Sequence, residues 1–291
     1  MRSLIGCFLG ALFALAAVML SAFMADNFDV LYLDWAMLGL GLGFLFWVFH
    51  YGNRRAPRAL VRALFLPDHE YRSASVENFP WLDREFYDAN RNILAAGGYR
   101  FLGDMEDATV NRGFTNPRTF QRYMASEDGT VVIQFLHIRL RWRQRMFMRG
   151  SSPYIIGFTV EAEDGRLFQT VHAEHLPELL APPPEFFRLL FSAPFSAAAA
   201  CIAFQERYAR FRLEHPDFRP RAIRTPEELI ASLRRHDALV ARHRRQIGSI
   251  TPEEAIRLGA SPKIAAHIVK QRRKLDAEVL AELAAEEASV P

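Results

Sequence analysis

Two long apolar stretches open the chain and constrain its architecture more than any other feature. The first, residues 4–24, contains no charged side chain, and the second, residues 30–50, contains only Asp34. At 1.5 Å per residue, an α-helix over either stretch would cover about 30 Å, the thickness of the hydrocarbon core of a bilayer. The sequence therefore predicts a two-helix transmembrane anchor over residues 1–52.

The charges around these stretches predict an orientation. Arg2 precedes the first stretch, and the connection between the two contains aspartates but neither lysine nor arginine. Four arginines follow the second stretch closely: Arg54, Arg55, Arg58 and Arg62. Because lysine and arginine collect on the cytoplasmic side of membrane proteins, we expect both termini in the cytoplasm and the chain in the inner (cytoplasmic) membrane.

Cleavage is the main alternative for the N-terminal stretch. A signal peptidase site needs small residues one and three positions before the cut, and a cut after Ala25 places Phe23 at the third position. A cut after Ala22 places Leu20 there. Residues 4–7 have the composition of a lipoprotein acylation site, but only three residues precede them, which is too few for a signal. An uncleaved anchor is therefore favoured.

Small residues recur at four-residue spacing in both stretches. The glycines at this spacing are Gly6, Gly10, Gly39 and Gly43. Such spacing lets helix backbones approach closely inside a bilayer. Two interpretations stay open: the two helices pack against each other within one chain, or a glycine face forms a homodimer.

The rest of the chain divides into three predicted parts. Residues 53–66 form a basic amphipathic helix beside the membrane, in which Arg54, Arg55 and Arg58 contact anionic lipid. Residues 67–215 form an α+β domain, and residues 216–291 form a helical C-terminal region. The formal net charge of the whole chain is only +3, and such a small excess does not by itself indicate nucleic acid as a partner.

A change of the hydrophobic period from 3.6 to 2 predicts the sheet of the α+β domain. Asp128-Gly129 and Asp164-Gly165 each separate two alternating segments, and Asp-Gly is a strong hairpin signal because tight turns need positive φ. The expected strands cover residues 118–125, 131–146, 154–163 and 166–172, with a further strand from 99–104 or 108–114. We therefore expect an antiparallel sheet of four to six strands.

Helical patterns flank these strands. Residues 81–96 repeat apolar side chains at three- to four-residue steps and stop at two glycines. Residues 196–213 align Phe204, Tyr208 and Phe211 in one stripe that should lie on the sheet. Thr225-Pro-Glu-Glu has the pattern of a capped helix start and predicts a helix to about residue 246. The predicted fold class is α+β, with a transmembrane hairpin in front and a helical region behind.

Alternating arginines mark the expected strand 131–146. Four of them share one face if the segment is a strand: Arg139, Arg141, Arg143 and Arg145. Three interpretations compete for this ladder. It is a solvated strand face paired with carboxylates such as Glu161 and Glu163, a contact for anionic lipid, or a binding surface for nucleic acid or an acidic protein.

Two histidines invite a metal interpretation. His172 and His175 flank one glutamate, but their spacing differs from the helical zinc motif, in which two histidines lie four residues apart. A third ligand would have to come from elsewhere, for example His137. The chain contains only two cysteines, Cys7 and Cys201, which excludes a disulfide framework and a cysteine zinc site. The sequence therefore predicts neither a metal nor a cofactor.

The sequence contains no nucleophile elbow, phosphate-binding glycine loop or kinase signature. The favoured function is a membrane-anchored cytoplasmic interaction or scaffolding module. Its expected partners are the lipid bilayer, a protein bound through the C-terminal helices, and a second copy of the chain; nucleic acid is disfavoured. The alternative is a membrane-tethered enzyme of unknown reaction, for which His172 and His175 would be the first residues to test.

Overall fold

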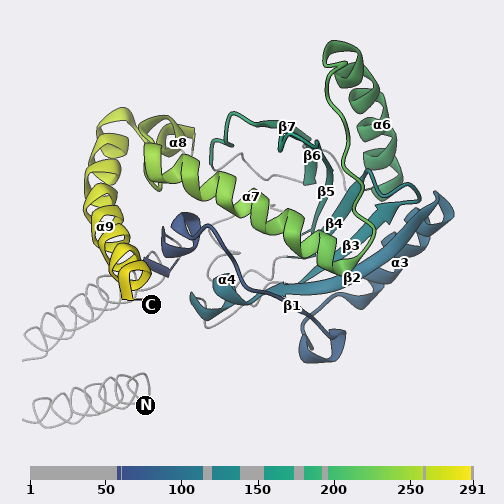
Figure 1. Ribbon diagram of the computed structural model, residues 1–291, viewed down its shortest axis with the longest axis horizontal. Helices are drawn as coiled ribbons and strands as arrows, with labels where there is room; N and C mark the ends of the chain where they lie inside the picture. Colours follow the sequence, from purple (N-terminus) through teal and green to yellow (C-terminus); the bar gives the residue numbers. More distant parts are fainter. Residues whose placement is uncertain are drawn as a thin grey trace, which may run out of the picture. The chain divides into compact units, whose positions relative to one another are not determined.

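A seven-stranded sheet organises the computed structural model of the chain, which describes residues 58–59, 61–113, 120–137, 154–173, 180–191, 196–257 and 260–289 (Figure 1). The strands lie in the sheet in the order in which they occur in the sequence. They are β1 Tyr71–Ser73, β2 Tyr99–Asp107, β3 Gln121–Ser126, β4 Val132–His137, β5 Tyr154–Glu161, β6 Leu167–Ala173 and β7 Phe186–Phe191. Every neighbouring pair is antiparallel except β6 and β7, which are parallel.

Both Asp-Gly hairpin turns predicted from the sequence are confirmed. Gly129 joins β3 to β4 with φ +78°, and Gly165 joins β5 to β6 with φ +87°. The Asp128 carboxylate accepts a hydrogen bond from the Thr130 amide at 3.0 Å, which fixes the first turn. These turns set the register of the two hairpins, as the local sequence requires.

The predicted sheet is corrected in two respects: it has seven strands instead of four to six, and it is mixed instead of antiparallel. β7 is not among the expected strands, because its sequence FFRLLF lacks polar alternation. It pairs in parallel with β6 after a connection that includes Pro182–Pro184. β1 is three residues long, which is too short to produce a periodic signal.

Helices form where the sequence supplies caps. Besides the helical residues 61–65, the described helices are α3 Arg84–Ala96, α4 Ala108–Gly113, α6 Ala197–Glu214, α7 Pro226–Ile247, α8 Pro252–Arg257 and α9 Pro262–Ser289, with a 3₁₀ turn η1 at Val76–Asn78. At the start of α7, the Thr225 hydroxyl accepts from the Glu228 amide and the Glu228 carboxylate accepts from the Thr225 amide. This reciprocal capping box confirms the predicted start of α7.

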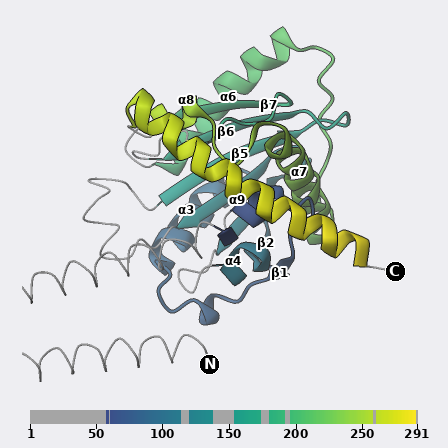
Figure 2. The ribbon, with the colours of Figure 1, turned by 90° about the vertical axis from the view of Figure 1, so that its left-hand side faces the viewer.

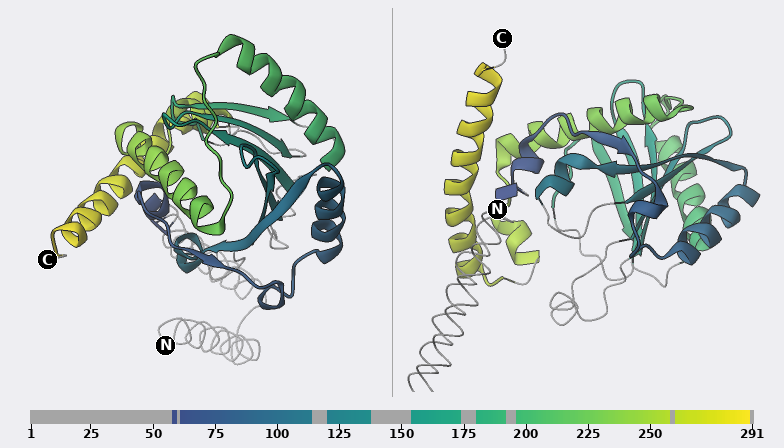
Figure 3. Two further views of the ribbon diagram at one scale, coloured as in Figure 1. Left: turned by 45° about the vertical axis from the view of Figure 1, so that its right-hand side comes forward. Right: turned by 90° about the horizontal axis from the view of Figure 1, so that it is seen from below.

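One face of the sheet is covered by α3 and α6, and the other by α7 (Figure 3). The first face holds an aromatic core in which Phe158 and Phe168 of the sheet contact Phe204 of α6. Tyr208 and Phe211 continue this contact, so the predicted stripe on the sheet is confirmed. Fully burying one such aromatic side chain contributes about 2 kcal/mol to the free energy of unfolding.

The opposite face holds a smaller apolar cluster beneath α7. Met105, Tyr123 and Val132 of the sheet lie in this cluster with Ile223 and Leu229. Alternate residues of a strand point to opposite faces, which places the neighbouring Met124 and Ile133 in the aromatic core instead. The position of α7 is therefore fixed by the period-2 pattern of β2, β3 and β4.

The sheet curls around α7, because this helix contacts both end strands of the sheet. The Tyr71 hydroxyl of β1 donates to Asp237 at 2.8 Å, and the Phe186 ring of β7 lies 6.1 Å from the ring of His236. In a flat sheet with strands about 4.8 Å apart, β1 and β7 would be separated by about 29 Å. Two adjacent residues of one helix reach both strands only because the sheet is strongly curved.

The C-terminal helices form a separate small core with the residues that precede β1. Val61 and Phe65, in the helical residues 61–65, pack against Val279 and Leu283 of α9. α8 lies against α9, which Figure 2 shows along its full length. Residues 58–291 group as one compact unit.

The predicted fold class is also corrected in its membrane component. Within the described residues, no helix combines the length and the apolar character needed to cross a bilayer. The two predicted spans, residues 4–24 and 30–50, lie outside the described residues. The structure therefore gives no support to a transmembrane hairpin or to the predicted location in the inner membrane with both termini cytoplasmic.

Candidate functional site

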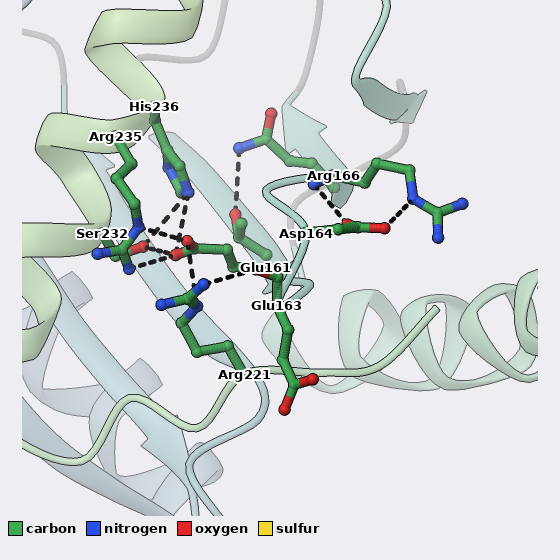
Figure 4. Close-up of polar contacts among 10 residues, drawn as sticks. Glu161, Glu163, Asp164, Arg166, Arg221, Ser232, Arg235 and His236 are labelled. Carbon is green, nitrogen blue, oxygen red and sulfur yellow. Dashed lines mark hydrogen bonds and ion pairs between the residues drawn. The ribbon is translucent and has the colours of Figure 1, made fainter. Parts of the chain in front are cut away.

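Glu161 ends β5 on the face that α7 covers, and it collects several polar side chains around one buried carboxylate (Figure 4). Arg235 of α7 donates from Nε to Oε1 at 2.6 Å and from Nη2 to Oε2 at 3.0 Å. The Ser232 hydroxyl donates to Oε2 at 2.5 Å, and His236 Nε2 lies 3.6 Å from the same oxygen. Arg221 Nε lies 3.6 Å from Oε1.

These partners keep Glu161 ionised although only 1% of its side chain is exposed. Burial on its own would raise the pKa of this carboxyl group. The nearby His236 imidazole and the hydrogen bonds from Arg235 and Ser232 outweigh burial and lower the pKa of Glu161 to about 2. The carboxylate is therefore charged throughout the physiological pH range and needs its cations in place.

The presence of serine, histidine and glutamate in one cluster raises the question of a nucleophilic triad. In a triad the acid contacts the imidazole nitrogen opposite the one that faces the serine. Here Ser232 Oγ and Glu161 Oε2 both lie near His236 Nε2, at 3.3 Å and 3.6 Å. Ser232 is also only 1% exposed, so a substrate carbonyl has no access to its hydroxyl. The geometry fits an ionic link between β5 and α7 and does not fit an acyl-transfer site.

A second polar cluster links α7 to the β1 end of the sheet. His69 Nδ1 lies 2.8 Å from Asp107 Oδ2 and 3.9 Å from Asp237 Oδ2. Burial and the neighbouring charge of Asp107 raise the pKa of Asp237 to about 6, against the opposing effect of His69 and Tyr71. Like the Glu161 cluster, this group joins side chains that are far apart in the sequence.

A third cluster anchors the C-terminal end of α7. Arg244 donates to both carboxylate oxygens of Glu254 in α8, at 3.1 Å and 2.8 Å, and to the Ala181 carbonyl oxygen at 2.5 Å. The Arg244 and Glu254 side chains are 1% and 0% exposed. Since Glu254 also accepts from the Thr251 amide, the pair positions α8 relative to α7.

The outward face of α9 carries cations that have no carboxylate partner among the described residues. α9 buries one stripe, formed by Ala265, Val269, Asp276, Val279 and Leu283. At 100° per residue, the opposite side of the helix presents four residues over three turns: Lys263, His267, Lys270 and Lys274. The three lysines are exposed, and none of them forms an ion pair with any described residue. We call these four residues the basic ridge.

The glutamates of α9 differ from its lysines, because they form ion pairs with arginines of the same chain. Arg58 pairs with Glu278 at 3.3 Å and also with Glu282, and Arg62 pairs with Glu286 at 2.5 Å. In a further pair, Arg245 Nη2 lies 3.3 Å from Glu287 Oε1. The glutamates in the second half of α9 therefore help to hold the helix in place, while the lysines in its first half face solvent.

The arginines expected to contact lipid or a partner are placed only in part. Arg58 lies beside α9 and pairs with its glutamates, as described above. The other members of the predicted set lie outside the described residues, as do the four membrane glycines: Arg54, Arg55, Arg139, Arg141, Arg143, Arg145, Gly6, Gly10, Gly39 and Gly43. The interpretations of the arginine ladder stay predictions.

The predicted histidine pair is also placed only in part. His172 lies buried on β6 with its ring stacked on Phe191 at 6.4 Å, and His175 lies outside the described residues. Among the described residues, no group of three histidine, cysteine, aspartate or glutamate side chains could hold a metal ion. An enzymatic role for these histidines stays a prediction.

Sequence reasoning missed the clusters on α7. No motif in the sequence singled out His236, whose ring lies against Phe186 and whose Nε2 lies near Glu161. One signal was available: Ser232, Arg235 and His236 have the spacing i, i+3, i+4, which places polar side chains on one helix face beside Leu229. Their common partner on β5 could not be read from that spacing.

Comparisons with known proteins add no relative to this description. Neither a family model, nor a curated protein, nor a solved structure matches the chain.

Proposed function

We propose that this chain is a non-enzymatic interaction module that binds an acidic helix of a partner protein along the outward face of α9. The observation that carries the proposal is the basic ridge of Lys263, His267, Lys270 and Lys274. Its lysines have no carboxylate partner among the described residues, whereas four glutamates of the same helix form ion pairs with arginines. Charged groups arranged along one face favour a partner of complementary charge.

The surface beyond the ridge supports a helix as the occupant. The outward face continues with exposed Ala277 and Ala281, which carry no charge and only a methyl group. A second helix can approach α9 closely at these alanines while its carboxylates reach the lysines. Phosphates of a nucleic acid would gain nothing from the alanine part of this face.

α9 is held rigidly enough to serve as a preformed surface. Val279 and Leu283 are buried against Val61 and Phe65, and Arg58 ties α9 to the same preceding segment. At the other side, the Asp276 carboxylate accepts from the Ser249 amide at 3.0 Å. A surface that is ordered before binding loses less conformational entropy when the partner docks.

A binding measurement with defined peptides tests the proposal. The probe is a fluorescent helical peptide with glutamates at positions i, i+4, i+7 and i+11, compared with a peptide of the same composition whose glutamates are scattered around the helix. Full-length protein should bind the first peptide at least about tenfold more tightly, because only that peptide aligns several charge-assisted contacts. Equal affinity for both peptides would contradict a ridge-specific partner.

A charge-matched control distinguishes the effect of the basic ridge on peptide binding from the effect of net charge. We expect the variant K263E/K270E/K274E to lose binding of the ordered peptide. The variant R84E/R100E/R219E changes the net charge equally at exposed arginines elsewhere and should retain binding. Preferential binding of a single-stranded oligonucleotide of equal charge would assign the ridge to nucleic acid and overturn the proposal.

A further inference from the structure

The charges around Glu161 do not cancel, because two guanidinium groups face one carboxylate. Arg235 Nε and Arg221 Nε lie 2.6 Å and 3.6 Å from the same oxygen, Glu161 Oε1. We propose that Arg221 and Arg235 together form a binding site for the phosphate group of a small molecule. The site is separate from the basic ridge and does not depend on the function proposed for α9.

Both arginines keep donors that no described residue uses. Arg235 engages Glu161 through Nε and Nη2, and Arg221 donates from Nη2 to the Glu163 carbonyl oxygen at 2.7 Å. In the described part of the chain, the Nη1 group of neither arginine has a hydrogen-bond partner. Guanidinium groups with N–H donors left over are well suited to bidentate contacts with oxyanions.

Solvent reaches the cations but not the carboxylate. The Arg221 and Arg235 side chains are 37% and 39% exposed, whereas the Glu161 side chain is 1% exposed. An incoming anion therefore meets two guanidinium groups and is shielded from the negative charge behind them. The Glu163 side chain is directed away from both guanidinium groups (Figure 4). Asp164 forms an ion pair with Arg166, with 2.7 Å between Oδ2 and Nε.

The backbone holds Arg221 in this position. Residues 219–221 run along the end of β5, with an isolated bridge between Ala162 and Pro220. The Arg221 amide donates to the Glu161 carbonyl oxygen at 2.7 Å, and the Glu163 amide donates to the Arg219 carbonyl oxygen at 2.9 Å. Arg235 is fixed by its two bonds to Glu161, so both cations are oriented before any ligand arrives.

The number of acceptor atoms favours phosphate over carboxylate. A phosphate monoester presents three terminal oxygens in different directions, so it can accept from two guanidinium groups at once. A carboxylate has two oxygens in one plane and is matched by a single arginine fork, as Glu161 already is by Arg235. The surplus positive charge also favours a phosphate, because its charge at neutral pH exceeds that of a carboxylate.

Calorimetry on the full-length protein with phenyl phosphate and benzoate as probes tests this site. Phenyl phosphate should bind, and R221Q should weaken it by about tenfold or more, because a charged donor is lost. The matched control is R234Q, since Arg234 neighbours Arg235 on α7 but pairs with Asp68 at 2.9 Å. R234Q should leave the affinity unchanged. Equal affinity of R221Q and the unchanged protein would overturn the proposal, as would tighter binding of benzoate.

Two further variants keep the outcome unambiguous. If R221Q lowers the melting temperature, R221K tests the site with the charge retained, and we expect weaker phenyl phosphate binding because lysine lacks the planar fork. Unchanged affinity of R221K would count against the site. The ridge variant K263E/K270E/K274E should bind phenyl phosphate normally, so failure of the α9 proposal and failure of this one are distinguishable.

Discussion

His69 and Asp107 form a buried contact, with 2.8 Å between Nδ1 and Oδ2, in which the imidazole must carry a positive charge. The other ring nitrogen, Nε2, lies 2.9 Å from the carbonyl oxygen of Ala63. A carboxylate and a carbonyl group only accept hydrogen bonds, so both ring nitrogens of His69 must be protonated. The imidazolium thus joins the segment before β1 to the end of β2.

This contact predicts a loss of stability at alkaline pH. Burial alone would lower the pKa of His69, but the Asp107 hydrogen bond and the charge of Asp237 outweigh it and raise the pKa from 6.5 to about 9. The contribution is complete below pH 6.5 and is lost as the pH rises to about 9. We expect the free energy of unfolding to fall by about 3 kcal/mol over this window.

Denaturant unfolding from pH 6 to pH 9.5 measures this effect. The variant H69Q should be less stable at pH 6 and should show a flatter pH dependence, because its amide does not titrate. The groups that face His69 are Asp107 from β2, Asp237 from α7 and the ring of Tyr71 from β1, whose hydroxyl group donates to Asp237. Asp237, with its raised pKa, adds a slope of the same sign only between pH 3.8 and about 6. An equal slope in H69Q would contradict the assignment.

Glu161 predicts the opposite pH dependence. Its pKa is lowered from 4.5 to about 2, so its contribution is present above pH 4.5 and is lost as the pH falls toward 2. At neutral pH, E161Q should lower the free energy of unfolding by about 1–3 kcal/mol, because the charge-assisted hydrogen bonds from Arg235 and Ser232 would be weakened while the exposed arginines stay hydrated. E163Q is the control at an exposed neighbour and should change it by less than about 0.5 kcal/mol. If E161Q lowers the free energy of unfolding no more than E163Q does, the Glu161 cluster does not stabilise the fold.

The Arg244–Glu254 pair offers a test of buried against exposed ion pairs. E254Q should lower the free energy of unfolding by about 3–5 kcal/mol, because it leaves a buried guanidinium without its charge partner. Arg245–Glu287, one residue along α7, is 37% and 63% exposed, and E287Q should cost less than about 1 kcal/mol. The double variant R244M/E254L should be more stable than E254Q alone. Urea unfolding of the four proteins decides between these expectations.

Alanine substitutions at Gly129 and Gly165 distinguish the cost of backbone strain from the cost of a steric clash. Both have positive φ, but a Cβ at Gly129 would lie 2.9 Å from the Ile223 carbonyl oxygen, while a Cβ at Gly165 would meet nothing within 4 Å. G165A should therefore cost only the strain of a left-handed alanine, about 1 kcal/mol. G129A should cost more, because the segment that leads into α7 must move. Equal melting temperatures for the two variants would contradict this.

Much of the fold could be predicted from local sequence. The Asp-Gly turns, the Thr225 capping box and the Phe204–Phe211 stripe each depend on residues within a few positions of one another, and all three agree with the structure. The parallel pairing of β7 could not be predicted in this way. It depends on the return of the chain after residues 174–185, which no local pattern encodes.

The candidate site was harder to predict, because its members come together only in the folded chain. Ser232 and Arg235 share a helix face in the sequence, but their partner Glu161 lies on a strand more than seventy residues earlier. The apolar N-terminal stretches gave the strongest sequence signal of all. The structure offers no support for the interpretation based on them, since no described helix has the properties of a bilayer span.

The curl of the sheet around α7 has a consequence for the order of folding. The antiparallel strands pair with neighbours in sequence, so β1 to β6 can assemble from short-range contacts as the chain leaves the ribosome. The Tyr71–Asp237 bond instead spans 166 positions and cannot form until α7 has been synthesised. We therefore expect the growing chain to expose the α7 face of its sheet until late in translation. A chaperone could bind this apolar face during that time, before α7 covers it.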